Sequence, residues 1–368
     1  MKDLILGIDF ESENIYVAYL KNNVPHLVEN AEGDYYTPTY VLEKSPGSLV
    51  IGKNAKKNKN GVHWLRNPNQ TATFVFNEKL YSIKDFCLKI FKQIKDFYQQ
   101  KFGDVLLRTV ISLPIYLKQE VYSLIEECGN AVGLNVMAVI NEPTAIALNY
   151  WQNNPHNNLS NLVVYDLGAN NLTISTIDIL HQMLILTKTA YFNPNLGLTT
   201  WIDEQAKYFL TRANKQLNTD YPKVIINQEY LKDKIIKYLQ NALISLSQKK
   251  ELILAINEPI GLDNGIPVIL KQMSEKGIDG SYDIFVNPLE DVISHPENDI
   301  LIAAGAGSNI KAIKEKIDYL DFKEVVYIAN CEQASALGAC WYGAIISGII
   351  PGKLVLSLTD NLKNMNDK

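Results

Sequence analysis

The chain has 368 residues, of which 47% are hydrophobic and 20% are charged, so it is long enough to bury the cores of two lobes. Its net charge of −5 is mild, which argues against a general attraction to nucleic acid or to an anionic membrane. The first residues enter an apolar strand pattern without a basic segment or cleavage site, so we expect a cytoplasmic protein with no nucleic-acid or membrane partner.

Strand and helix patterns alternate through the first part of the chain. Apolar runs and alternation predict strands at residues 4–9, 15–21, 26–29, 39–42, 105–113 and 134–140. Apolar side chains at three- and four-residue spacing predict helices at residues 82–102, 118–132 and 144–151. The strand–helix–strand–helix order favours parallel pairing and an α/β fold.

The second part of the chain continues this alternation. Strands are predicted at residues 162–177, 184–190 and 301–304, and helices at 199–213, 232–247, 310–317 and 331–347. Residues 251–297 show only short, alternating strand and turn patterns, and their secondary structure is the hardest to predict. The four cysteines form no C-x-x-C pair, so we expect reduced, buried thiols and no zinc site.

One pattern occurs twice. Residues 5–20 and 162–177 align without a gap as an apolar run, one aspartate, a short polar turn and a second apolar run. Asp9 aligns with Asp166. Each copy predicts a β-hairpin whose first strand ends in a carboxylate, once in each half of the molecule.

The residues between the two hairpins carry a more specific pattern. Thr109–Tyr116, the helix after it and the block Gly133–Tyr150 resemble the ATPase domain of the seventy-kilodalton heat-shock chaperones. Asn195-Leu196-Gly197 resembles the next glycine motif of that family, and residues 304–310 resemble its adenosine motif. The resemblance spans nearly the whole chain and is weak over residues 215–297.

The resemblance implies the actin-like ATPase fold, an α/β architecture of two lobes with a cleft between them. Each lobe is built on a mixed β-sheet flanked by helices. We expect lobe I at residues 1–178, lobe II at 179–329, a helix at 330–350 that returns to lobe I and a linker-like tail at 351–368.

The tail contains Leu354–Leu358, which resembles the hydrophobic linker that follows the family's ATPase domain. This segment is expected to dock on its own chain as an edge strand, to be offered to a partner, or to form a short terminal core strand. The resemblance ends there, and the family's substrate-binding half is not expected in this sequence.

The resemblance also implies a site for ATP or ADP with magnesium. The implied catalytic residues are Asp9, Glu142 and Asp166, and the two aspartates would hold magnesium through water. The implied nucleotide-binding residues are Gly168, Gly197, Gly305, Gly307 and Ser308. Structural interpretations stand beside these roles: strand-end caps for the aspartates, a helix start for Glu142 and a tight turn for the glycines.

The two turns that would hold phosphate depart from the family's pattern. Glu11-Ser12-Glu13 stands where the family has Gly-Thr-Thr, and Ala169-Asn170-Asn171 stands where it has two more glycines and a threonine. A phosphate turn needs close backbone approach and no fixed negative charge. At about 5 Å and an effective dielectric near 20, each like-charge pair costs roughly 3 kcal/mol before screening.

Further positions of the implied site have also changed. Phe76 stands where the family's lysine reaches the γ-phosphate, and Lys79 replaces that lysine only if the loop is shifted. Gln240–Ile244 carries no charge where the family clamps adenine with charged residues, Leu198 replaces a glycine, and Thr173 replaces an aspartate. These changes coincide with the phosphate, lysine and adenine positions, whereas the patterns that build the lobes are retained.

Three functions remain open from the sequence. The leading hypothesis is a chaperone-related scaffold with a degenerate nucleotide site that binds a protein partner, which is a chaperone, a co-chaperone or another copy of itself. The first alternative is a divergent, active ATPase in which Lys79 or another lysine stands in for the lost one. The second is another actin-like protein, a filament former or a small-molecule kinase.

Overall fold

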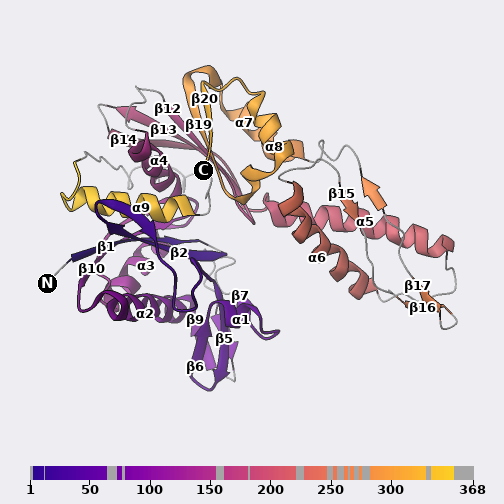
Figure 1. Cartoon of the computed structure of the whole chain (residues 1–368), viewed down its shortest axis with the longest axis horizontal. Coiled ribbons are helices and arrows are strands. Elements are labelled where there is room, and N and C mark those ends of the chain that lie inside the picture. The colour runs from indigo at the N-terminus through magenta and orange to yellow at the C-terminus, as the bar shows by residue number, and fades with distance from the viewer. Residues whose placement is uncertain are drawn as a thin grey trace. The chain divides into compact units, whose positions relative to one another are not determined.

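The structure of the chain is a computed structural model (Figure 1). It describes residues 3–11, 13–63, 73–76, 79–154, 161–180, 183–220, 228–246, 252–254, 261–263, 266–268, 273–275, 282–328 and 333–351. Ser12, Cys331 and the linker-like segment Leu354–Leu358, which the sequence singled out, lie outside the described residues.

The chain divides into two compact units. Unit 1 comprises residues 1–164, 175–189 and 328–368, and unit 2 comprises residues 165–174 and 190–327. The division passes through the second hairpin, so the strands of that hairpin contribute residues to both units. Among the described helices, none is long and apolar enough to span a bilayer.

A six-stranded mixed sheet forms the centre of unit 1, in the order β11-β10-β1-β2-β3 with β4 also paired to β2. Its strands are β1 (Asp3–Phe10), β2 (Asn14–Lys21), β3 (Val24–Leu27), β4 (Tyr36–Pro38), β10 (Leu106–Leu113) and β11 (Val136–Asn141). β1 and β2 form the first predicted hairpin. β1, β10 and β11 run parallel, as the strand–helix order predicted.

Four longer helices belong to unit 1: α2 (Ile83–Phe102), α3 (Gln119–Ala131), α4 (Glu142–Asn153) and α9 (Ala334–Ile346). Local chemistry accounts for the bounds of α2. Ser82 and Asp85 form a capping box at its start, and Gly103 follows its last residue with φ +84°. The predicted helix at 82–102 is therefore confirmed almost to the residue.

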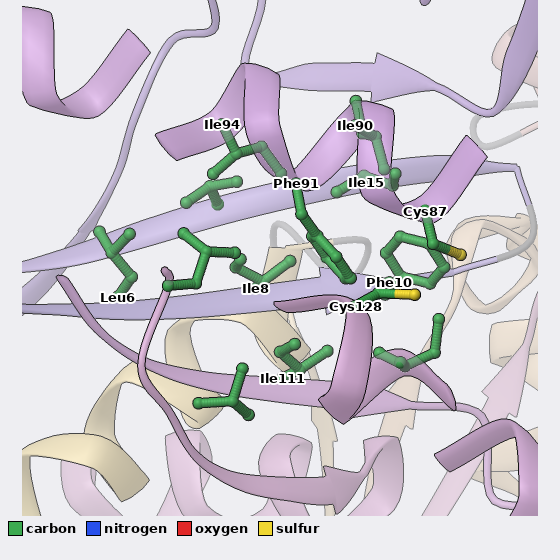
Figure 2. Packing of buried hydrophobic residues seen from close by; sticks show 14 of the residues in the cluster. Leu6, Ile8, Phe10, Ile15, Cys87, Ile90, Phe91, Ile94, Ile111 and Cys128 are labelled. Atoms are coloured by element: carbon green, nitrogen blue, oxygen red, sulfur yellow. The ribbon is translucent and has the colours of Figure 1, made fainter. Parts of the chain in front are cut away.

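The main core of unit 1 lies between α2, α3 and the sheet (Figure 2). Ile8 of β1 and Phe91 of α2 are completely buried, and the Phe91 ring lies 5.2 Å from that of Phe10. Cys87 of α2 and Cys128 of α3 belong to the same core, and both are free, buried thiols. Cys340 of α9 is also free and buried, so the expectation of buried thiols is confirmed for the three described cysteines.

Helix α9 packs against β1, β2, β10 and α4 (Figure 1). It is rich in Ala and Gly because backbones approach closely there. A Cβ on Gly338 would overlap the carbonyl oxygen of Ala145 in α4, and a Cβ on Gly7 of β1 would overlap the carbonyl oxygen of Ala336.

Smaller elements complete unit 1: β5 (Tyr40–Ser45), β6 (Ser48–Ile51), α1 (Lys53–Lys56), β7 (Val62–His63), β8 (Thr73–Phe76) and β9 (Lys79–Ser82). Their hairpins were not predicted from sequence. Buried Glu43 connects two of them, because its carboxylate accepts hydrogen bonds from the Tyr81 hydroxyl and the Gly47 N–H, both at 2.7 Å.

A second mixed sheet has the order β14-β13-β12-β19-β20. Its strands are β12 (Asn161–Leu167), β13 (Leu172–Leu180), β14 (Met183–Asn193), β19 (Asp299–Ala304) and β20 (Glu324–Tyr327). The helices of unit 2 are α5 (Leu198–Asp220), α6 (Gln228–Leu246), α7 (Asp283–Val292) and α8 (Lys311–Asp318), with short 3-10 turns at Pro296–Asn298 and Ala306–Asn309. Short strands form two further pairs, β15 (Leu252–Leu254) with β18 (Met273–Glu275), and β16 (Gly261–Asp263) with β17 (Ile266–Val268). Two mixed sheets flanked by helices confirm the predicted α/β class.

Candidate functional site

The carboxyl ends of three parallel strands meet at one edge of the unit 1 sheet. In the strand register Asp9 of β1 lies opposite Ser112 of β10, and Ser112 lies opposite Ile140 of β11. Glu142 follows two residues after Ile140, at the start of α4. The topology therefore brings Asp9 and Glu142 to the same edge, which is the usual place for ligands in parallel α/β sheets.

Asp9 is held by its neighbouring strand. Only 3% of the residue is exposed, and its Oδ1 accepts a hydrogen bond of 3.0 Å from the Ser112 hydroxyl. A buried carboxylate needs such partners to remain charged. Ser112 was not singled out in the sequence, because only the pairing of β1 with β10 brings it beside Asp9.

Glu142 is the first residue of α4 and is buried. The helix is capped by the side chain of Asn141, whose Oδ1 accepts a hydrogen bond of 2.9 Å from Thr144 N, and Pro143 lies in the first turn. The Asn-Glu-Pro motif is therefore a helix start, with an acidic side chain at the positive end of the helix dipole.

Tyr122 of α3 lies within electrostatic reach of Glu142. Burial, and after it the negative charge of Glu142, raise the pKa of Tyr122 well above its ordinary value. The Tyr122 hydroxyl donates a hydrogen bond of 3.1 Å to the carbonyl oxygen of Pro114. Like Ser112, Tyr122 was not identified from sequence, where it is one member of an ordinary helical pattern.

Glu13, in the turn of the first hairpin, is attached to neighbouring strands. Its carbonyl oxygen accepts hydrogen bonds from the N–H and the hydroxyl of Thr39, both at 3.1 Å. Its carboxylate lies 3.7 Å from Nδ1 of His63, and the His63 ring stacks on Tyr40 with centroids 4.9 Å apart. These contacts hold the Glu13 carboxylate next to the first turn.

Lys79 was the candidate replacement for the family's lysine. It is exposed on β9, and its Nζ lies 4.9 Å from the centroid of the Tyr81 ring. The side chain of Phe76 lies outside the described part of the structure, and Gln240–Ile244 falls within α6.

The turn of the second hairpin is closed by its own backbone and by α5. Gly168 N donates a hydrogen bond of 3.0 Å to the carbonyl oxygen of Asn171. The N–H groups of Leu198 and Thr199, at the start of α5, donate to the carbonyl oxygens of Gly168 and Ala169 at 3.2 and 2.8 Å. The first turn of α5 is therefore packed directly onto this turn.

The three implied glycines outside the hairpin all pack against it. A Cβ on Gly197 would lie 2.5 Å from the carbonyl oxygen of Ala169, and one on Gly307 would overlap the Leu167 side chain. Gly305 has φ +77°, and a Cβ there would lie 2.5 Å from Oδ1 of Asp166. Close packing therefore favours glycine at all three positions, most strongly at Gly197 and Gly305, where the added atom would meet backbone.

Ser308 completes this arrangement in unit 2. It is buried, and both its backbone N–H and its hydroxyl donate to the carbonyl oxygen of Gly305, at 3.2 and 2.8 Å. Together with the glycine contacts, this groups Gly168, Gly197, Gly305, Gly307 and Ser308 around Asp166 and the end of β12. Asp9 and Glu142 belong to the separate edge in unit 1.

Protein atoms surround the carboxyl group of Asp166, although part of the residue's surface still reaches water. This desolvation raises the pKa of the Asp166 carboxyl from 3.8 to about 6. A shifted carboxyl at the end of a strand is a common property of functional sites. Among the described residues, no three His, Cys, Asp or Glu side chains gather closely enough to hold a metal ion by themselves.

Comparison with known proteins identifies the family to which the chain and its fold belong. The family model described as "Hsp70 protein" matches residues 60–360. The chain therefore belongs to the Hsp70 family, and its two-sheet architecture is the actin-like ATPase fold of that family. Members of the family typically bind ATP with magnesium.

The chain is similar to several curated chaperones. It is 28% identical over 374 residues to the chaperone protein DnaK of Metamycoplasma hominis. The aligned region covers 97% of this chain and 62% of that protein. The chaperone protein DnaK of Mycoplasma mycoides subsp. mycoides SC is also 28% identical, over 375 residues with the same coverage. The chain thus spans about three-fifths of the length of the relatives that it matches.

Proposed function

We propose that this chain is a divergent ATPase-domain protein of the Hsp70 family with a degenerate nucleotide site, and that it acts by binding a protein partner. The observation that carries the proposal is that the retained family glycines are those with a packing role, whereas the glycines of the phosphate turns are replaced. Gly197, Gly305 and Gly307 each have a packing reason to be glycine, because a Cβ would meet β12 or the second turn. The family glycines of the two turns themselves are replaced by Glu11, Ala169 and Asn170.

The acidic first turn supports the same proposal. Glu11 and Glu13 flank the position where the family's turn approaches phosphate, and contacts with Thr39 and His63 keep Glu13 in place. Two carboxylates next to a triphosphate repel it by roughly 3 kcal/mol per close pair before screening. Asp9 fits a structural role as well, since it accepts a hydrogen bond from the Ser112 hydroxyl.

Calorimetric titration with ATP and magnesium tests the degenerate site. We expect no saturable binding up to about 1 mM nucleotide, whereas binding in the micromolar range with measurable turnover would reject the proposal. A DnaK chaperone measured in parallel shows that the assay detects binding.

A pair of double variants tests the proposed cause. Glu11→Gly with Glu13→Thr restores family residues in the first turn, and we expect it to bind nucleotide more tightly than the native chain. Glu126→Gln with Glu127→Gln removes the same formal charge from the exposed face of α3 and controls for net charge. Equal gains in both double variants would show that overall charge, and not the turn, limits binding.

The proposed partner is a chaperone, a co-chaperone or a second copy of this chain. Sedimentation velocity of the purified chain, alone and mixed with a DnaK chaperone, separates these cases. A heavier complex in the mixture supports a chaperone partner, a concentration-dependent shift of the chain alone supports self-association, and unchanged sedimentation in both experiments contradicts these two partners.

An active, divergent ATPase is the second candidate, and one observation favours it. Asp9 and Glu142 lie at the same strand edge, where ligands of parallel sheets bind. In that case Asp9→Ala and Asp166→Ala abolish hydrolysis. Turnover that survives both substitutions would show that these residues do not form the site.

A further inference from the structure

Two cysteine thiols meet where helices α2 and α3 pack against each other in unit 1. Cys87 belongs to α2 and Cys128 to α3, and both residues are free and completely buried in the same core (Figure 2). The Cys87 thiol donates a hydrogen bond to the sulfur of Cys128. The fold therefore brings two free thiols from distant parts of the sequence within reach of each other.

The two thiols differ in their environment. Burial, and after it the hydrogen bond with Cys128, raises the pKa of the Cys87 thiol well above its usual value. The hydrogen bond from Cys87, together with the positive charge of Lys84, lowers the pKa of Cys128. Burial and the charges of Glu127 and Asp85 oppose this shift without reversing it. Because the thiolate is the nucleophilic form of cysteine, Cys128 is the more reactive member of the pair.

Cys128 is the shallower of the two thiols. Its Sγ donates a hydrogen bond of 3.9 Å to the carbonyl oxygen of Lys84. The Lys84 ammonium pairs with the Glu127 carboxylate at 3.7 Å, and more than half of each of these side chains is exposed. An exposed ion pair of this kind contributes little to stability, so it opens readily. Separation of Lys84 from Glu127 brings water and small solutes towards the Cys128 sulfur.

We propose that Cys87 and Cys128 are a peroxide-sensitive pair that becomes a disulfide between α2 and α3. The Cys128 thiolate attacks one oxygen of hydrogen peroxide, the O–O bond breaks and hydroxide leaves, so Cys128 becomes a sulfenic acid. The Cys87 sulfur then attacks the Cys128 sulfur, the S–O bond breaks, and water leaves with the proton of the Cys87 thiol. The two sulfurs lose two electrons in total, and the peroxide gains them.

Peptide mapping by mass spectrometry tests the cross-link on the purified full chain. The native chain is treated with hydrogen peroxide, its remaining thiols are alkylated, and it is digested without reductant. We expect a species in which the peptides of Cys87 and Cys128 are joined with the loss of two hydrogen atoms, and a thiol reductant should separate them. Cys340→Ala removes another buried thiol of unit 1, in α9, and should leave this cross-link intact.

Single variants test the order of the two steps. In Cys87→Ala the reaction should stop at the sulfenic acid of Cys128, which dimedone traps, and Cys128→Ala should give at least about tenfold less adduct at Cys87. Lys84→Gln should slow cross-linking about threefold because it removes the cation beside Cys128. Lys92→Gln removes the same charge from α2 at an exposed position that pairs with Asp96, and it should not. Circular dichroism and thermal melting verify that each variant is folded.

Several results would overturn the proposal. If Cys87 and Cys128 both stay free in the peroxide-treated native chain, or are joined only after unfolding in urea, the fold does not prepare them for oxidation. Accumulation of sulfinic acid at Cys128 without a cross-link would show that Cys87 does not complete the reaction. Equal dimedone labelling of the two single variants would remove the assignment of Cys128 as the attacking thiol. A disulfide that involves Cys331 or Cys340 instead would place the oxidation elsewhere.

Discussion

At the scale of single residues, the charge state of Asp166 depends on its environment. Shielding from water raises its pKa from 3.8 to about 6, so the folded protein holds this proton more tightly than the unfolded chain does. Stability therefore falls as the pH rises from about 4 to about 7, and the penalty for the charged form is complete only above about pH 7. At neutral pH the charged form of Asp166 therefore lowers the stability of the fold.

Asp166→Asn should remove this penalty. We expect the variant to be more stable than the native chain by about 2–3 kcal/mol above pH 6.5 and nearly equal to it at pH 4. Urea unfolding at several pH values measures the difference in unfolding free energy between the variant and the native chain. Asp291→Asn, an exposed position in α7, controls for net charge. A gap that is the same at every pH would contradict the assigned shift.

Residue roles were only partly predictable from sequence. The repeat located Asp9 and Asp166 at strand ends, and the structure places both there. Ser112 and Tyr122 could not be found in this way, because Ser112 lies 103 residues from Asp9 and meets it only through strand pairing. The spacing of residues along the chain therefore cannot predict such a contact.

At the scale of elements, α9 shows packing that overrides helix propensity. Ala is a better helix former than Gly by about 1 kcal/mol, so propensity alone favours alanine throughout this helix. Gly338 instead faces the backbone of α4, where a Cβ would overlap the carbonyl oxygen of Ala145. Gly343 faces only side chains, with Ile5 Cγ2 2.7 Å from an added Cβ.

Gly338→Ala should therefore destabilise unit 1 by about 2–4 kcal/mol, because α9 and α4 must separate. Gly343→Ala is the matched substitution on the same helix and should cost less, since the end of a side chain can shift. Urea unfolding compares the two variants. Equal costs would mean that backbone overlap does not govern the packing of α9.

Most of the longer elements were predictable, and the failures have local causes. The helices at 82–102 and 118–132 follow apolar periodicity with clear end signals, and they appear as α2 and α3. The hairpins β5–β6 and β8–β9 were missed because their strands are short and partly exposed. Helix α7 was missed because Pro288 lies inside it and the flanking patterns are short.

At the scale of the whole molecule, the two ends of the described chain meet in unit 1. β1 and α9 pack together although more than three hundred residues separate them, as in the hydrogen bond from the Cys340 thiol to the carbonyl oxygen of Ile5. Eleven of the thirteen residues of α9 are buried. Unit 1 therefore needs the C-terminal part of the chain to complete its core.

Truncation tests this dependence. A chain that ends at residue 332 lacks α9 and should lose the cooperative unfolding of unit 1, because β1, β2 and β10 lose the helix that covers them. A chain that ends at residue 351 keeps α9 and serves as the reference. Near-ultraviolet circular dichroism during thermal melting follows the tertiary packing, and identical melting of the two chains would contradict the prediction.

Sequence patterns alone predicted the class of fold, the order of the longer elements, the repeated hairpin and the resemblance to a family. These features follow from periodicity, turn chemistry and motifs, which are local along the chain. Tertiary packing, in contrast, brings Ser112 to Asp9 and leaves little room for a side chain at Gly197, Gly305 and Gly307. Those properties depend on which distant segments pack together, and packing is set by the whole core at once.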